Sequence, residues 1–286
     1  MTAATADAVP GPDEPAGRPF ADCTADSAGG LTFDIALPGE GERWDAGLLL
    51  RRRGTDPVET VRLPLVPAGE GTFRAVLPST VPLAEGRWNA YLVLGESGPR
   101  RLLPGRTDLG PLLERVPRSG RTWLGVRIPY GTRHGNLAVR AWLRWPHAEA
   151  ADLRLDSGGM TLHGRLFGAA LSPEARIELR QGHAGQPVLS APVTHDGPGF
   201  VCRLPLTGLV PRPSGEERWD LWLRTDPAAE AVRVGRILDD LPDKRYTADT
   251  PKVPLAEAEG TVAQVCYTAD NDLSLLLAPV GGLPAR

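Results

Sequence analysis

Short stretches in which apolar and polar residues alternate recur along the chain. Residues 31–37 form one such stretch and residues 87–94 form another. A period of two is the period of a half-buried β-strand. Glycine and proline separate the stretches, and helical spacing is confined to the short segments 108–116 and 237–241. The pattern predicts an all-β protein of many short strands.

A longer pattern occurs twice, about 130 residues apart. Each copy contains an apolar strand that ends in Leu-Pro, a strand that begins with Arg-Trp, and a turn that follows a tyrosine. The landmarks are residues 73–78, 87–92 and 130–139 in the first half, and residues 200–205, 218–223 and 267–275 in the second. A chance match would not keep its offset through several landmarks, so the sequence predicts an internal duplication. We expect two tandem Ig-like domains, each a sandwich of two antiparallel sheets.

The duplication suggests where the domains begin and end. Residues 1–29 are rich in Ala, Pro and acidic residues and are expected to be a disordered leader. The expected order after the leader is a first sandwich over 30–146, a linker over 147–159, a second sandwich over 160–278 and a tail over 279–286. Neither a secretory signal nor an apolar run of membrane-spanning length is visible, so we expect a cytoplasmic protein.

Charge and cysteine content narrow the possible partners and sites. The formal net charge is -3, which disfavours a whole-protein positive field for nucleic acid or anionic lipid. Cys23, Cys202 and Cys266 form no CxxC pair, so neither a zinc site nor a disulfide framework is expected. Buried free thiols are the simplest interpretation, and a bridge between Cys202 and Cys266 is the alternative.

The motifs of common enzyme classes are missing from the sequence, so we assign no catalytic residue, cofactor or metal. The nearest approach to one is Asp270-Asn-Asp272, because two carboxylates at this spacing can share a divalent cation. The matching residues of the first copy are His134-Gly-Asn136, which could not do the same. Both triplets suit a tight turn, so a turn is the favoured interpretation. His134, Asp270 and Asp272 remain candidate ligand contacts.

Aromatic and basic residues supply the other candidates. Trp88 and Trp219 occupy the same place in both copies and are expected in the core. Tyr91 and Trp222 point the other way and are candidate surface contacts, for a protein or for stacking on a sugar. The arginine triplet 51–53 could hold a polyanion, but its members alternate between faces, and a solvated strand end is the simpler interpretation.

One family resemblance rests on the paired segments 130–139 and 267–275. They look like a Y-x(2–4)-[GN]-[ND]-L-[SA]-[VL] signature. This signature resembles β-sandwich modules of actinobacterial cell-envelope proteins, which sit beside glycosyltransferase or CDP-glycerol glycerophosphotransferase domains of the teichoic-acid type. In that family a separate α/β domain carries the chemistry, so the resemblance transfers no catalytic residue to this chain.

The resemblance implies a non-catalytic binding or scaffold protein that acts beside synthesis of an envelope glycan or teichoic-acid-like polymer. Its expected partner is an envelope-polymer transferase or a glycan, and neither nucleic acid nor a membrane span is expected. One alternative is a transferase of sugar or glycerol phosphate, with a site near residues 147–156 or at the last turns. The second alternative is a carbohydrate-binding module.

Overall fold

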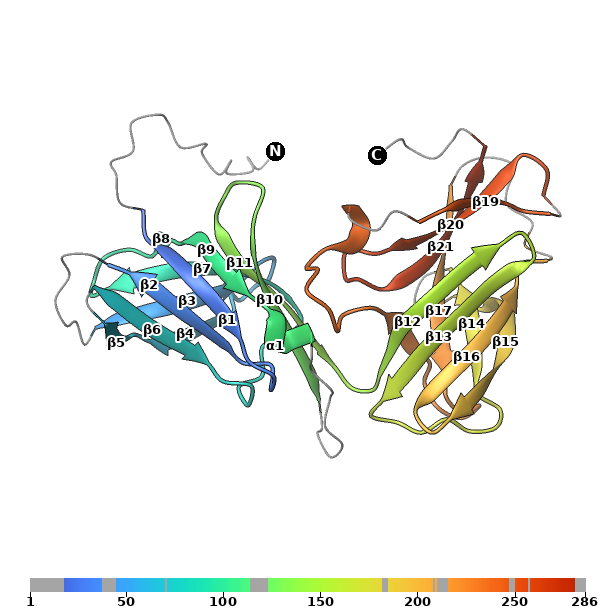
Figure 1. Ribbon diagram of the computed structural model, residues 1–286, viewed down its shortest axis with the longest axis horizontal. Helices are drawn as coiled ribbons and strands as arrows, with labels where there is room; N and C mark the ends of the chain where they lie inside the picture. Colours follow the sequence, from blue (N-terminus) through green and yellow to red (C-terminus); the bar gives the residue numbers. More distant parts are fainter. Residues whose placement is uncertain are drawn as a thin grey trace. The chain divides into compact units, whose positions relative to one another are not determined.

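Strands make up almost all the regular structure (Figure 1). The computed structural model describes residues 18–37, 45–69, 71–113, 123–181, 185–207, 209, 216–246, 250–256 and 258–280. The chain divides into two compact units. Unit 1 comprises Met1–Arg115 and Arg127–Trp142, and unit 2 comprises Val116–Val126 and Leu143–Arg286. None of the helices in the described ranges has the length and apolar character needed to cross a membrane.

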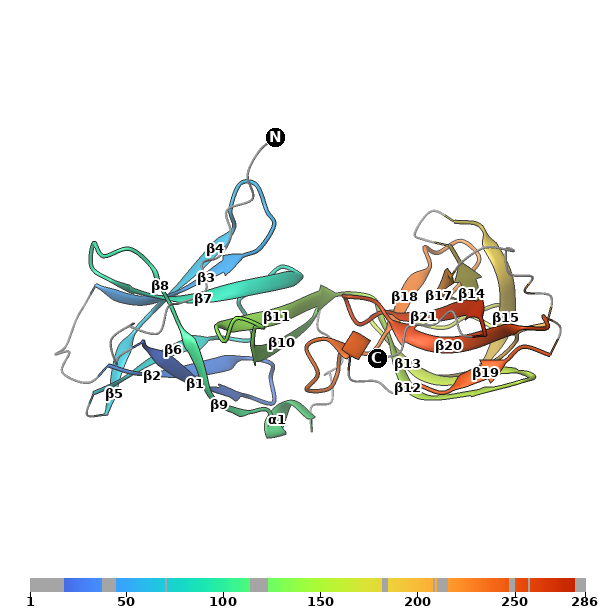
Figure 2. The same cartoon turned by 90° about the horizontal axis from the view of Figure 1, so that it is seen from above.

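Unit 1 contains two sheets, ordered β5-β6-β2-β1-β9 and β10-β11-β7-β3-β4, with β8 also paired to β7. In Figure 2 the strands β1, β2 and β6 lie below β3, β4 and β7. Inward side chains such as Phe33 and Leu92 are fully buried. The elements are β1 Phe20–Ala25, β2 Leu31–Ala36, β3 Ala46–Arg52, β4 Thr60–Pro64, β5 Val66–Gly69, β6 Thr72–Leu77, β7 Gly86–Leu94, β8 Arg100–Arg101, β9 Leu103–Asp108, α1 Gly110–Leu113, β10 Leu124–Gly131 and β11 Leu137–Arg144.

Unit 2 follows one hydrogen-bonded path, β14-β15-β16-β13-β12-β18-β17-β21-β20-β19. An additional pairing of β14 with β17 closes the first seven of these strands into a ring. The elements are β12 His147–Asp156, β13 Gly159–Phe167, β14 Arg176–Arg180, β15 Pro187–Asp196, β16 Gly199–Pro205, β17 Glu217–Arg224, β18 Val232–Gly235, the 3-10 helix η1 Lys244–Tyr246, β19 Lys252–Pro254, β20 Thr261–Tyr267 and β21 Leu273–Pro279.

The two units repeat one pairing scheme. The antiparallel pairs β1–β2, β2–β6, β3–β7 and β7–β11 of unit 1 correspond to β12–β13, β13–β16, β14–β17 and β17–β21 of unit 2. The first strand of each unit also pairs in parallel with a later one, β1 with β9 and β12 with β18. The sequence repeat therefore has a matching repeat of topology.

The all-β class is confirmed, but the two-sheet Ig-like sandwich is not. The strands of unit 2 form a continuous path with a closed ring, and parallel pairs occur in both units. Segment 237–241 is also not helical, whereas α1 lies inside the other expected helical segment.

Two boundaries differ from expectation. Strand β1 lies within the expected disordered leader, and β12 occupies most of the expected linker. The inward positions of β1 are the small residues Ala21, Cys23 and Ala25, which give only a faint apolar pattern. Residues 1–17 and 281–286, which include most of the expected leader and tail, lie outside the described residues.

The core predictions for the paired tryptophans hold. Trp88 and Trp219 are 2% and 7% exposed, and the Trp88 indole donates a hydrogen bond to the Ala84 carbonyl at 2.9 Å. Cys202 and Cys266 are free thiols, as is Cys23, so the alternative of a bridge between them is wrong.

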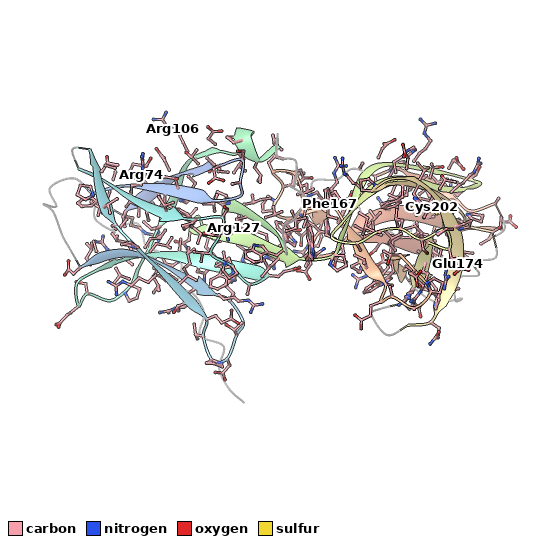
Figure 3. All side chains as sticks on the ribbon, turned by 90° about the horizontal axis from the view of Figure 1, so that it is seen from below. Arg74, Arg106, Arg127, Phe167, Glu174 and Cys202 are labelled. Atoms are coloured by element: carbon pink, nitrogen blue, oxygen red, sulfur yellow. The ribbon has the colours of Figure 1, made fainter. Side chains whose placement is uncertain are left out.

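One buried arginine of unit 1 serves the fold. Arg127 of β10 is 3% exposed and lies among the strands of unit 1 (Figure 3). Its guanidinium donates to the carbonyls of Gly29 at 3.3 Å and Pro78 at 2.8 Å, and to that of Val81. Because these acceptors belong to loops, the buried cation joins loops that are distant in sequence.

Candidate functional site

An aromatic side chain flanked by two arginines stands on the outer face of the sheet in each unit. In unit 1, Tyr91 of β7 has the guanidinium carbon of Arg51 at 5.2 Å from its ring centroid and that of Arg101 at 4.8 Å. Arg51 comes from β3 and Arg101 from β8, which pair with β7. These distances are those of cation–π contacts. All three residues are half-buried, so the group is held in place yet reachable.

The same arrangement occurs in unit 2. Trp222 of β17 lies between Arg180 of β14, at 5.6 Å, and Arg233 of β18, at 5.0 Å. Trp222 is only 5% exposed, so its expected role as an open surface contact is wrong. The alternation of β17 places the ring on the outer face as predicted, but the arginines cover it. Its counterpart Tyr91 keeps partial exposure.

A buried carboxylate neutralises part of the arginine face of unit 2. The Glu178 side chain has no exposed area and accepts hydrogen bonds from Arg180 at 2.9 Å and Arg224 at 2.6 Å. Arg176 lies 3.1 Å from the same carboxylate. Burial alone would raise the pKa of Glu178, but the hydrogen bonds from Arg224 and Arg180 outweigh it and hold the pKa below its ordinary value.

Two further carboxylates complete this network. Asp220 accepts hydrogen bonds from Arg233 and from the Ser274 hydroxyl, both at 2.8 Å. Asp272 lies 2.6 Å from Arg144 and 3.7 Å from Arg233. Burial lowers the pKa of the Arg233 guanidinium, while the Asp220 and Asp272 charges act against that shift. The three carboxylates therefore neutralise only part of the charge of these five arginines.

The segment Asp270-Asn-Asp272 is a turn, as the sequence comparison favoured. Asn271 has a φ of 57° and Gly135 at the matching place has a φ of 71°. Both Asp272 oxygens face guanidinium groups, and the Asp270 side chain is exposed. Over the described ranges, no group of three or more His, Cys, Asp or Glu side chains could hold a metal ion. The geometry gives the metal alternative no support.

The remaining sequence candidate, His134, lies apart from the arginine faces. It is exposed on the turn after β10, where Arg133 Nε is 3.0 Å from its Nε2. Two residues later, the side-chain amide oxygen of Asn136 accepts a hydrogen bond from Arg18 at 2.7 Å. Nothing in this geometry brings His134 together with Tyr91.

Unit 2 also contains a buried polar cluster at the start of β12, within the segment 147–156 where the transferase alternative placed a site. The Glu149 carboxylate accepts from His147 at 2.7 Å and from the backbone amides of Ile237 and Leu238 at 3.0 Å. Lys244, 2% exposed, lies 2.6 Å from Asp239. Burial lowers the pKa of Lys244. The contacts of this cluster fasten the segment between β18 and η1, which is a structural role.

Comparisons with known proteins give no family. Neither the protein-family models nor the curated proteins contain a match. Among solved structures, a crystal structure of S. aureus TarS residues 217–571 matches at 13% identity and a TM-score of 0.30, over 66% of this chain and 56% of that one. A second S. aureus TarS structure matches at 13% identity and a TM-score of 0.29, over 65% of this chain and 35% of that one. A marsupial T cell receptor matches at 9% identity and a TM-score of 0.26, over 91% of this chain and 90% of that one.

The chain thus spans about half, or less, of the TarS chains that it matches. Scores this low carry no argument about function. The resemblance to envelope proteins of the teichoic-acid type remains a weak one, and an actinobacterial origin has no support from these matches.

Proposed function

We propose that the chain is a non-catalytic binding protein that contacts its ligand or partner through the outer face of the sheet of unit 1 that contains β7. The observation that carries this proposal is the half-buried group of unit 1, in which the Tyr91 ring lies between Arg51 and Arg101. Arginine and aromatic side chains are the residues most enriched at binding hot spots. We further propose, from the paired turn segments alone, that it works beside synthesis of a glycan or teichoic-acid-like envelope polymer.

The strands at the ends of the sheets favour contact through faces over contact through edges. Among the described strands, those at a free end of the three hydrogen-bonded paths each carry a proline. Proline lacks the amide hydrogen that is needed to extend a sheet. These residues are Pro67 in β5, Pro104 in β9, Pro129 in β10, Pro64 in β4 and Pro254 in β19. Addition of a partner strand at these edges is therefore disfavoured.

The state of the titratable groups supports a non-catalytic role. Glu149 and Glu178 are both held by several hydrogen bonds, and Lys244 is held by Asp239. A general acid or base must reach the proton that it transfers. Groups already engaged within the fold are poorly suited to that task.

A titration of the full chain separates the proposed function from the transferase alternative. CDP-glycerol, a panel of nucleotide sugars and a soluble glycerol-phosphate polymer would each be added in a calorimeter, with product formation followed by phosphorus NMR. We expect heat of binding with the polymer and no product from any nucleotide. Conversion of CDP-glycerol or of a nucleotide sugar would overturn the non-catalytic proposal.

The carbohydrate-binding alternative has less support from the geometry. Stacking on a sugar needs an open aromatic face, whereas guanidinium groups lie about 5 Å from the rings of Tyr91 and Trp222. A glycan array is the direct check. Binding of a neutral glycan that is lost on Tyr91→Ala would favour this alternative over the proposal.

A further inference from the structure

Tyr246, at the end of η1, is the most exposed aromatic side chain among those that the structure describes. It is 75% exposed, and the other exposed ring, that of Phe20 in β1, is 45% exposed. The helix η1 lies beside β20. A single exposed ring is common on protein surfaces, so the way in which Tyr246 is held decides whether it has a role.

Buried polar side chains hold the segment that leads to Tyr246, although residues 236–243 form neither helix nor strand. Glu149 accepts hydrogen bonds from two backbone amides of this segment. The Asn271 side chain donates to one of its carbonyl oxygens at 2.9 Å and accepts from the amide of Lys244 in η1 at 3.0 Å. These three residues are at most 8% exposed. Because buried polar groups are costly unless they are paired, the contacts fix the backbone that presents Tyr246.

A guanidinium group braces the Tyr246 ring itself. The guanidinium carbon of Arg245 lies 5.0 Å from the ring centroid. The Nε and Nη2 atoms of Arg245 donate hydrogen bonds to the two carboxylate oxygens of Asp243, at 2.9 Å and 2.6 Å. Tyr91 and Trp222 each lie between two arginines, whereas the described residues place one arginine beside Tyr246. The ring is therefore held in place and still open, which lowers the entropy that binding would cost.

Charged side chains lie beside this ring. The hydrogen bonds to Asp243 raise the pKa of the Arg245 guanidinium, and the charge of Asp270 acts in the same direction, so Asp270 lies near the pair. Asp270 is exposed and belongs to the turn that supplies Asn271. The Asp243 contacts engage Nε and Nη2 of Arg245, and its Nη1 has no hydrogen-bond partner among the described residues. Hydrogen-bond donors and acceptors therefore stand beside an open aromatic face.

This combination suits a sugar better than a protein. The centre of a protein interface is apolar and depleted in charged residues, whereas the neighbours of Tyr246 are charged. A sugar ring offers C–H groups that pack on an aromatic face and hydroxyls that both donate and accept hydrogen bonds. Residues 236–246 and the turn also carry no excess of positive charge, which disfavours a phosphodiester polymer. Their charged residues are Arg236, Lys244 and Arg245 on one side and Asp239, Asp240, Asp243 and Asp270 on the other.

We propose that Tyr246 and Arg245 form, with Asp270, a platform on unit 2 that binds a neutral sugar ring of a glycan. The Tyr246 ring packs on the C–H face of the sugar, and the sugar hydroxyls pair with Arg245 and Asp270. This inference goes beyond the proposed function, which places the contact on the β7 face of unit 1. The two sites share no residue, so each can be removed alone.

The experiment is a titration of the full chain with soluble neutral oligosaccharides of glucose, galactose, mannose and N-acetylglucosamine, followed by saturation-transfer NMR and calorimetry. A glycerol-phosphate oligomer is the anionic comparison. We expect saturable binding of at least one neutral oligosaccharide. Its affinity should change little when salt is added, because the ligand carries no charge. The anionic oligomer should not compete for this site.

Substitutions at the ring provide the decisive comparison. Tyr246→Ala should weaken sugar binding about tenfold or more, because the ring supplies the packing surface. Tyr246→Phe keeps the ring and should bind within about threefold of the unchanged chain. Arg245→Ala removes the brace and its donors and should also weaken binding. Phe20→Ala is the matched control, because it removes the other exposed ring, and it should bind like the unchanged chain. Since Tyr246 is exposed, Tyr246→Ala should leave the melting temperature unchanged.

Three results would overturn the inference: no saturable binding of any neutral oligosaccharide, equal binding by Tyr246→Ala, or an equal loss in Phe20→Ala. Competition by the glycerol-phosphate oligomer would overturn the assignment of a neutral ligand, and undiminished binding by Arg245→Ala would remove Arg245 from the site. The proposed function fails separately. A chain that binds no glycerol-phosphate polymer loses that function and keeps the sugar site, whereas polymer binding without sugar binding removes the sugar site alone.

Discussion

Replacing Glu178 with Gln is expected to destabilise unit 2 far more than an ordinary surface change would. The Glu178 side chain has no exposed area. Its carboxylate accepts hydrogen bonds from three arginines, with N–O distances of 3.1 Å to Arg176, 2.9 Å to Arg180 and 2.6 Å to Arg224. The substitution removes the negative charge and leaves three positive charges close together.

The size of the expected loss in the free energy of unfolding follows from the burial of Glu178 and the partial exposure of its three arginines. Removing one partner of a buried ion pair costs about 3–5 kcal/mol, because the other charge stays behind. Here the arginine side chains are 36%, 12% and 20% exposed, so water can rehydrate them in part. The glutamine also keeps one carbonyl acceptor. We therefore expect Glu178→Gln to lower the free energy of unfolding by about 2–3 kcal/mol at pH 7.

The contribution of Glu178 to the stability of the chain should depend on pH in a definite direction. The pKa of Glu178 is lowered in the folded chain from its ordinary value of 4.5. Its contribution to stability is therefore present above the unfolded pKa and is lost as the pH falls through the folded pKa. The difference between the unchanged chain and Glu178→Gln should be constant from pH 7 to about pH 5 and shrink in more acidic solution.

Urea unfolding followed by tryptophan fluorescence measures this difference, because Trp219 and Trp222 belong to the affected unit. Asp34→Asn is the control, since it breaks the exposed pair of Asp34 with Arg74 in unit 1. That control should barely shift its transition. If Glu178→Gln cost no more than the control, or if the difference did not shrink in acid, the role given to the buried carboxylate would be refuted.

Three smaller predictions follow from the turns and the thiols. Asn271→Ala should lower the melting temperature more than Asn271→Gly, because both lose the side-chain hydrogen bonds but only alanine is strained at a φ of 57°; equal losses would contradict this. Gly135→Ala, with open space around the new methyl, should cost about 1–2 kcal/mol from its φ of 71° alone, measured by thermal unfolding; an unchanged melting temperature would speak against it. Burial raises the pKa of Cys23 to about 12 and that of Cys202 to about 11, so both should resist a thiol reagent at pH 8 until the chain is unfolded, and rapid native labelling would disprove their burial.

The sequence was sufficient for the features that depend on local pattern. Alternation predicted the strands, and the repeat predicted that Trp88 and Trp219 lie in the core. The tight turn at Asn271 and Gly135 also followed from residue chemistry, because few other residues adopt a left-handed backbone. These predictions need only one strand or one turn at a time.

Features that depend on pairing between distant strands could not be predicted in this way. Strand β12 carries His147 and Glu149 at buried positions, where polar residues hide the apolar pattern of a strand. Trp222 was assigned to the correct face, but alternation does not tell whether that face is covered. It is covered by Arg180 and Arg233, whose strands reach Trp222 only through the register of the sheet.

The duplicated fold makes one copy a reference for the other. In unit 2 the carboxylates of Glu178, Asp220 and Asp272 pair with the arginines of the outer face. In unit 1 the strand registers place Leu49 at the position of Glu178, and Gly47 and Val93 at those of Arg176 and Arg224. Because unit 1 forms the same strand pairs without this network, the pairing scheme itself does not require a buried carboxylate. The stability that we expect Glu178→Gln to lose therefore comes from the arginines left without their anion, and not from a loss of strand pairing.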